Sequence, residues 1–312
     1  MRALLLVTLT GCGLGWIGGE DDRTAGLPTS GAGPYKPLES DDLTPASEPR
    51  FVNDNRANLS DPSMLAGGPG IRVWFTRSTD DPLVSEIFYT EARSPHELPE
   101  TPTRVLSASE PWEEGIVGSP SVMPDPAGGL VMFYQGGVAM PSIGRAVSTD
   151  GLSWTKDPDP VLVGAIGPSV VFAYGETWLF ATRPNEPGIW RAVDAGSGFA
   201  FDGAPIIEPR PSDNDAFDRV AVSDPFALAV PTLGTETRIH LWFTGATDKP
   251  TDAVAVGYAS SFDGVTWGRF GGEKPMLKAD AAQPTVILEP SGGLMLYRVS
   301  VASRFALNAA EH

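Results

Sequence analysis

The chain has 312 residues, 41% of them hydrophobic, which is typical of a folded globular protein and excludes a disordered one. Its formal net charge is −17, and no cluster of Lys and Arg offsets that charge locally, so nucleic acid is excluded as a partner. The 35 glycines and 30 prolines favour many short strands joined by tight turns over a helical fold.

The N-terminus resembles a bacterial lipoprotein signal. Arg2 precedes an apolar run over residues 3–9, and the sequence Leu9-Thr10-Gly11-Cys12 resembles a lipobox, in which the cysteine becomes the lipidated first residue. We therefore expect a signal peptide over residues 1–11, a lipid on Cys12, and an exported protein anchored in the bacterial cell envelope, at the outer membrane or cell surface. An ordinary secretory signal and a misassigned start are the alternatives.

Residues 12–49 are rich in Gly, Pro, Ser and Asp and poor in apolar side chains, so they predict a flexible tether after the lipidated cysteine. No further segment is long and apolar enough to span a bilayer. The remaining residues, 50–312, form the predicted folded domain. We expect it to be a monomer that meets the membrane only through the lipid anchor.

The folded domain repeats a short motif five times, a proline near the start of an apolar strand. The five prolines are Pro62, Pro120, Pro168, Pro225 and Pro284. Each is followed, after a turn, by a strand with large side chains at fixed places. These strands contain Val73-Trp74-Phe75-Thr76, Met132-Phe133-Tyr134-Gln135, Trp178-Leu179-Phe180-Ala181, Leu241-Trp242-Phe243-Thr244 and Met295-Leu296-Tyr297-Arg298. Large side chains that recur on both faces of a strand are what stacked sheets need.

Two units continue into nearly identical corners, Ser148-Thr149-Asp150-Gly151-Leu152-Ser153-Trp154 and Ser261-Phe262-Asp263-Gly264-Val265-Thr266-Trp267. The Asp-Gly pair supplies a turn and the Trp packs back on its sheet, so we expect a structural role for the motif. Units of about 50 residues with several short strands predict an all-β fold, a five-bladed β-propeller of four-stranded antiparallel blades. The last unit is too short for four strands, so an N-terminal strand around Phe51-Val52 is expected to close the ring.

Radial repetition places equivalent residues around one central axis. The residue before each motif proline is expected to line one mouth of the central channel; these residues are Asp61, Ser119, Gly167, Asp224 and Gln283. The alignment of the aromatic strands places Gln135, Ala181, Thr244 and Arg298 in register with Thr76. Gln135 and Arg298 are therefore candidate substrate-binding residues. Arg298 is the cation among these positions, and a cation beside the carboxylates of Asp61 and Asp224 can hold them ionised or orient a hydroxyl-rich ligand.

An aromatic residue next to an acid precedes two of the blades at the same spacing. Trp112-Glu113-Glu114 lies before Pro120 as Phe217-Asp218-Arg219 lies before Pro225. Trp112, Glu113 and Asp218 could form the rim of a sugar site or a structural corner, and the sequence leaves both open.

Taken together, the repeat, the Asp-Pro-Ser motif of the first unit and the Trp corners resemble the five-bladed glycoside hydrolases. That group includes the arabinanase/xylosidase family 43 and the invertase-like family 32, and the resemblance covers roughly residues 50–312. It implies that Asp61 is the base or nucleophile. The family's second-blade Asp is replaced here by Ser121, and its general acid, two residues before the third-blade proline, is replaced by Ile166. Because hydrolysis by this route needs two carboxyl groups, whether this chain is an enzyme stays open.

Two substitutes for the missing acid are open. Asp224 could pair with Asp61 across the channel mouth as a second catalytic residue, or Glu113, Glu114 or Asp218 could reach in from a loop. The structural alternative is that Asp61 and Asp224 each accept hydrogen bonds from amides of neighbouring blades.

We expect no cofactor and no metal, because His96, His240 and His312 are isolated; the acidic loop at residues 213–218 leaves calcium open. The sequence thus predicts a cell-envelope, carbohydrate-active propeller that binds or hydrolyses a glycan or small saccharide at the channel mouth. The alternative is a non-catalytic lipoprotein that acts as a binding or scaffold module.

Overall fold

The computed structural model describes a large part of the chain. The described residues are 35–37, 57–67, 70–80, 83–93, 101–232, 236–249, 254–269, 274–277, 280–289, 292–301 and 304–311. Within these ranges no helix has the length and hydrophobicity to cross a bilayer. The signal peptide, Cys12 and Phe51-Val52 lie outside the described residues, so lipidation stays a prediction.

The strands form five antiparallel sheets, each ordered from an inner to an outer strand. The first blade contains β2 (Asn58–Gly67), β3 (Gly70–Asp80), β4 (Leu83–Ala92) and β5 (Thr103–Leu106). The second contains β6 (Val117–Pro124), β7 (Leu130–Gly136), β8 (Ser142–Ser148), β9 (Thr155–Lys156) and β10 (Leu162–Val163). The third contains β11 (Ile166–Ala173), β12 (Glu176–Arg183), β13 (Glu186–Asp194) and β14 (Phe199–Phe201). The fourth contains β15 (Ala221–Pro231), β16 (Thr237–Ala246), β17 (Val254–Ser261) and β18 (Gly268–Arg269). The fifth contains β19 (Ala282–Glu289), β20 (Gly292–Val301), β21 (Arg304–Glu311) and β1 (Lys36–Pro37).

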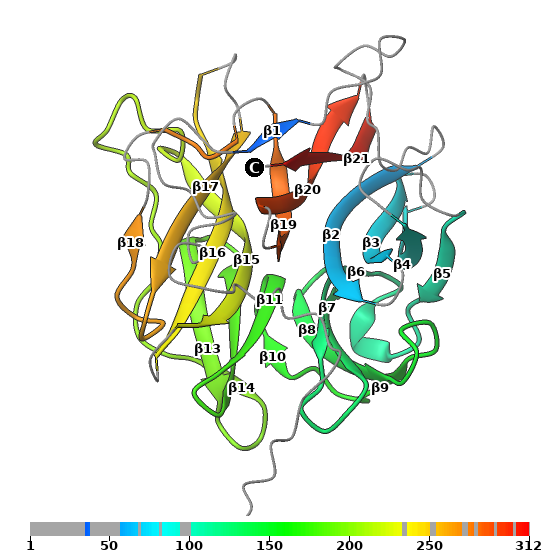
Figure 1. Cartoon of the computed structure of the whole chain (residues 1–312). Coiled ribbons are helices and arrows are strands. Elements are labelled where there is room, and N and C mark those ends of the chain that lie inside the picture. The colour runs from blue at the N-terminus through cyan, green and yellow to red at the C-terminus, as the bar shows by residue number, and fades with distance from the viewer. Residues whose placement is uncertain are drawn as a thin grey trace, which may run out of the picture.

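These sheets confirm the predicted five-bladed propeller. In Figure 1 the inner strands β2, β6, β11, β15 and β19 surround the centre of the molecule. An N-terminal strand closes the ring, as predicted, although not at the expected Phe51-Val52, and Figure 1 shows it, blue β1, beside dark red β21. That strand is Lys36–Pro37, which pairs with Ala310 and Glu311 and lies inside the segment predicted as a tether.

Five apolar clusters form the core, one between each pair of adjacent blades. Successive residues of a second strand face opposite neighbours. On β3, Val73 and Phe75 pack toward the fifth blade, whereas Trp74 packs toward the second. This alternation explains why the sequence carries large side chains on both faces of these strands.

The two Trp corners are structural, as predicted, but Trp154 and Trp267 pack on Trp74 and Phe180 of the preceding blade rather than back on their own sheet. Asp150 Oδ1 accepts hydrogen bonds from the amides of Leu152 and Ser153, both at 2.8 Å. The carbonyl of Gly151 accepts bonds from the indoles of Trp154 and Trp74, and Trp74 belongs to the first blade. A Cβ on Gly151 would stand 2.7 Å from Trp74, so this corner requires glycine for the close approach of two blades. Asp263 repeats the hydrogen bonds of Asp150, whereas the indole of Trp267 has no hydrogen-bond partner among the described residues.

Candidate functional site

The residues before the five motif prolines meet at the centre of the propeller, and we call this ring the hub. All five have a positive φ, from 47° at Ser119 to 60° at Gly167. Each lies at a register shift of its inner strand, which is the sign of a β-bulge. Four of the five are not glycine, and a residue before proline ordinarily avoids this conformation. A rare backbone conformation is thus repeated in every blade where the strands converge.

The hub encloses a cavity of about 30 Å³. Its lining includes all five hub residues and the prolines that follow them. A volume of this size holds about two water molecules, so a sugar ring does not fit between the hub residues. Any saccharide would have to lie against the outer side of the hub.

A first set of hydrogen bonds joins neighbouring blades through the hub amides. The N–H of Ser119 donates to Thr76 Oγ1 at 2.7 Å, and that of Gly167 donates to Gln135 Oε1 at 3.1 Å. The N–H of Gln283 donates to Thr244 Oγ1 at 2.8 Å. Gln135, predicted as a substrate-binding residue, therefore already has its amide oxygen engaged by the next blade.

The observed register corrects one predicted position. Thr76 pairs with Ser60, two residues before its motif proline, and the equivalent partner of Ile166 is Thr182. Ala181, which the sequence alignment placed there, lies one residue before Thr182 on β12. Thr182 Oγ1 has no hydrogen-bond partner within the described part of the chain.

A second set of hydrogen bonds lies one step further along the inner strands. Ser63, Ser121 and Ser169 each accept a hydrogen bond from an amide of the next blade, at 2.8–3.0 Å. Thr285 does the same for the N–H of Met64 at 3.2 Å. Ser121, which replaces an acid of the resembled family, is thus a structural link between the second and third blades.

Two carboxyl groups face the hub cavity, those of Asp61 and Asp224. Each accepts a hydrogen bond from the hydroxyl of the preceding serine at 2.8 Å. Burial, and to a smaller extent the charge of Asp224, raise the pKa of Asp61 to about 6, although hydrogen bonds from Ser60 and Thr76 oppose the rise. Because both residues line the same cavity, these two carboxyl groups, 163 residues apart in sequence, share one site.

The amides of neighbouring blades bind other acceptors than the two carboxylates. The N–H of Asp61 itself donates to Gln283 Oε1 at 3.3 Å, and the amides of three other hub residues, Ser119, Gly167 and Gln283, donate to Thr and Gln side chains. Among the described residues, no amide of a neighbouring blade donates to Asp61 or Asp224, so the structural alternative drawn from the sequence finds no support in that part of the chain. Their oxygens remain available to the cavity.

Arg298 lies near the hub, as the sequence predicted. Its positive charge lowers the pKa of Asp61, but this is the smallest of the effects on that group. Its guanidinium stacks on Phe305 at 4.1 Å from the ring centroid, and its Nε has no hydrogen-bond partner within the described residues. Arg298 therefore biases the hub electrostatically without pairing with either carboxylate.

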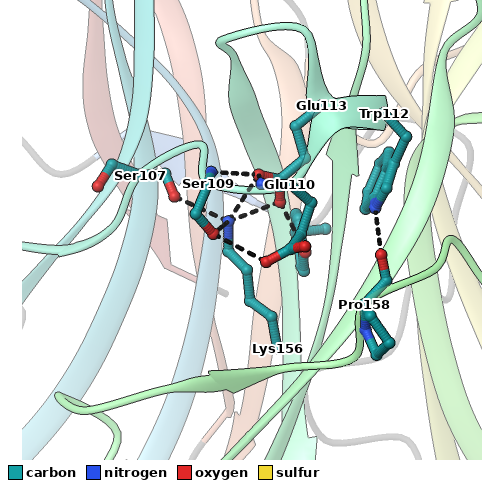
Figure 2. Close-up of polar contacts among 8 residues, drawn as sticks. Ser107, Ser109, Glu110, Trp112, Glu113, Lys156 and Pro158 are labelled. Atoms are coloured by element: carbon teal, nitrogen blue, oxygen red, sulfur yellow. Dashed lines mark hydrogen bonds and ion pairs between the residues drawn. The ribbon is translucent and has the colours of Figure 1, made fainter.

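Glu113 forms a buried structural clamp across the second blade (Figure 2). Its side chain is fully buried, and its carboxylate contacts Lys156 Nζ at 2.6 and 2.8 Å. The hydroxyl of Tyr134 and the amides of Ser109 and Glu110 donate to the same group. The neighbouring Trp112 stacks on Tyr134 at 5.9 Å and donates from its indole to the carbonyl of Pro158.

Asp218 forms the equivalent clamp in the fourth blade. It is fully buried, and its two oxygens contact Arg210 Nε at 2.7 Å and Arg269 Nη1 at 2.5 Å. Phe217 stacks on Phe243 at 6.1 Å, as Trp112 does on Tyr134. The geometry favours the structural-corner interpretation of Trp112, Glu113 and Asp218 over the sugar-rim interpretation, because every carboxylate oxygen is occupied.

Sequence reasoning missed the cations of these clamps, although a signal was present. Lys156 and Arg269 each stand two residues after the Trp of a corner motif, Trp154 and Trp267. Both lie on short outer strands, β9 and β18. The acid before the blade and the cation after the corner are thus one repeated unit that ties the start of a blade to its outer edge.

The general-acid position of the resembled family carries no titratable group here. Ile166 begins β11 and pairs with Thr182 across the sheet. An isoleucine cannot donate a proton, and neither Glu113 nor Asp218 is free to replace it. Glu114 is exposed and accepts the amides of Val138 and Ala139, which lowers its pKa.

The acidic loop at residues 213–218 does not gather its carboxylates around one point. Asp213 Oδ1 accepts the amide of Asp215, Asp215 contacts Lys249 at 3.1 Å, and Asp218 is held by arginines. Among the described residues no three His, Cys, Asp or Glu side chains are arranged as metal ligands.

The fold is that of the five-bladed glycoside hydrolases. The GH43_1 enzyme from Xanthomonas citri complexed with xylotriose superposes on this chain with a TM-score of 0.58 and 14% sequence identity. The superposition covers 83% of this chain and 88% of that enzyme. An exo-1,5-alpha-L-arabinanase from a bovine ruminal metagenomic library gives 0.59 and 12% identity over 84% and 94% of the two chains. A further glycoside hydrolase gives 0.64 and 14% identity over 83% and 88%. The sequence matches no family profile and no curated protein.

Proposed function

We propose that this protein binds a saccharide at the outer side of the hub and does not hydrolyse it by the two-carboxyl route of the enzymes it resembles. One observation carries the proposal. Asp61 and Asp224 face a common cavity with no ion-pair partner among the described residues, on a fold shared with glycoside hydrolases. Carboxylates that lack a cation are ready acceptors for sugar hydroxyls.

Hydrolysis would need a protonated and an ionised carboxyl group on opposite sides of a glycosidic bond. Asp61, with a pKa of about 6, is mostly ionised at pH 7, and Ile166 stands where the resembled family has its acid. The cavity between the hub residues is also too small for a sugar ring. These features favour binding over turnover.

The test is a titration of the native protein with arabinosides, xylosides, fructans and mannosides, while reducing-end release is assayed in parallel. We expect saturable binding of one class, no release of sugar, and at least about a tenfold weaker affinity for Asp61→Asn. Glu114→Gln, an exposed acid outside the hub, is the matched control and should bind like the native chain. Turnover that Asp61→Asn abolishes would instead establish a glycosidase.

A second candidate is a scaffold or interaction module without glycan affinity. Two features favour it: Ser121 has become a structural link, and the hub is nearly filled by its own residues. Absence of binding across the whole panel, by a correctly folded protein, would select this candidate.

The cellular location is proposed from the sequence alone. A lipid on Cys12 would hold the propeller at the envelope through the residues that precede Lys36. Incorporation of a labelled fatty acid into the native protein but not into Cys12→Ala would support the anchor. Equal release of both proteins into the medium would contradict it.

A further inference from the structure

A second cavity lies at the end of the central channel opposite the hub. Its volume is about 440 Å³, within the range of about 300–1,000 Å³ that small-molecule sites occupy. Inner strands of all five blades line it, with side chains that include Leu65, Met123, Val171, Leu228 and Ile287. Ser121 and Phe226 border both cavities, so the hub closes this one at its inner end. Phe172, 45% exposed, marks its open end.

The side chains that line this cavity offer almost nothing to a sugar. Ser121 and Asp125 are the polar exceptions among the lining residues. The Ser121 hydroxyl already accepts the amide of Val170, and Asp125 Oδ1 accepts the amide of Ala127. An apolar cavity that is closed at one end and open at the other suits a narrow apolar ligand, because water gains few hydrogen bonds from these side chains.

Arg72 lies next to the wall of this cavity, and Arg145 contacts the lining residue Asp125 at 3.7 Å. Arg72 pairs in strand register with the lining residue Leu65, and its Nη2 lies 3.5 Å from where a Cβ on Gly67 would stand, at the end of β2. The guanidinium packs over Trp74 at 5.6 Å, and its Nε is buried without a hydrogen-bond partner in the described part of the chain. A buried donor without a partner is costly, so an acidic group supplied by a ligand would stabilise it.

We propose that this cavity binds the alkyl chain of a long-chain carboxylate, whose carboxylate group is held at the open end by Arg72. The alkyl chain replaces water along the inner strands, and the charge-assisted hydrogen bond selects an acid over an alcohol of equal length. The site lies away from Asp61 and Asp224 and is independent of the saccharide proposal.

The experiment uses the full chain carrying Cys12→Ala, so that no lipid of its own competes. A fluorescent C16 fatty acid is titrated in, and palmitate and hexadecanol are compared as competitors. We expect saturable binding at one site per chain, and palmitate should compete at least about tenfold better than hexadecanol. Ala229→Trp, which fills the cavity near its open end, should weaken probe binding by at least about tenfold. Arg72→Gln should remove the preference for palmitate and leave hexadecanol unaffected.

Val138→Trp places the same bulk at an exposed site outside the cavity and should bind like the parent chain. Asp61→Asn should also leave fatty-acid binding unchanged, which separates this site from the hub. Thermal unfolding and circular dichroism verify that each variant is folded; if Ala229→Trp fails, Leu65→Asn is the replacement. Absence of saturable binding, or binding that a folded cavity variant leaves intact, would overturn the proposal. A palmitate preference that survives Arg72→Gln would overturn the role of that arginine.

Discussion

The acids of the two clamps and the acids of the hub are chemically alike, but the fold gives their carboxylates different partners. Glu113 and Asp218 are fully buried, and each oxygen meets a cation or another donor. Asp61 and Asp224 accept hydrogen bonds from serine hydroxyls and have no ion pair within the described residues. Compensated carboxylates of the first kind hold blades together, whereas uncompensated ones repel each other and remain able to bind.

The largest effect should come from breaking a clamp. Glu113→Ala leaves Lys156, whose side chain is only 8% exposed, as a buried cation without its partner. We expect a loss of about 3–5 kcal/mol in the free energy of unfolding, measured by urea denaturation. Glu114→Ala, next to it but exposed, should cost far less. If Glu113→Ala lowered the free energy of unfolding by less than about 1 kcal/mol, the clamp acids could not be distinguished from the hub acids by their contribution to stability.

The contribution of the hub acid Asp61 to the free energy of unfolding should change with pH in the opposite direction from that of an acid in a salt bridge. Because the pKa of Asp61 is about 6 in the folded state and 3.8 ordinarily, the folded state holds its proton longer than the unfolded state. Stability should therefore fall as pH rises from about 4 to 6, by about 3 kcal/mol from this group, and then level off. Asp61→Asn should lack this fall and be the more stable protein above pH 6.

Unfolding curves of both proteins between pH 4 and 8 would measure this difference. Parallel pH profiles for the native chain and Asp61→Asn would contradict the raised pKa. An ion-paired acid makes the native state more stable as pH rises. If the native chain showed such a rise between pH 4 and 8, Asp61 would be a structural acid like those of the clamps.

The smallest effect should come from the hydrogen bonds between hub and blades. Thr76→Val removes the acceptor of the Ser119 amide and should cost about 1–3 kcal/mol in unfolding free energy. Thr182→Val is the matched control, because the hydroxyl at that equivalent position has no partner in the described residues. Equal losses for the two variants would show that the hub amides find other acceptors.

The sequence predicted the fold well because its signals repeat. The five prolines mark the inner strands, the aromatic motifs mark the second strands, and the two Trp corners mark turns. The structure confirms the five blades that these repeats predict. The position of Ala181 was wrong by one residue because a strand register depends on turn geometry, which the sequence pattern does not specify.

The candidate site was predicted less completely. The sequence placed Asp61 and Asp224 at one channel mouth, and the structure couples them electrostatically. It could not tell whether Glu113 and Asp218 face solvent, because burial depends on cations 43 and 51 residues further along the chain. The volume of the hub likewise depends on how closely five strands converge, which only the assembled ring determines.

Closure of the ring by β1 joins nearly the two extremes of the described chain, since Lys36 pairs with Glu311. The last blade therefore stays one strand short until both partners are present, and the edge of β21 is exposed in the meantime to other chains. So distant a contact in sequence makes assembly of the ring slow. A mechanical force applied to the chain before Lys36 would act first on the pairing of β1 with β21. Because this pairing has only two residues, it should be the first contact of the ring to break under force.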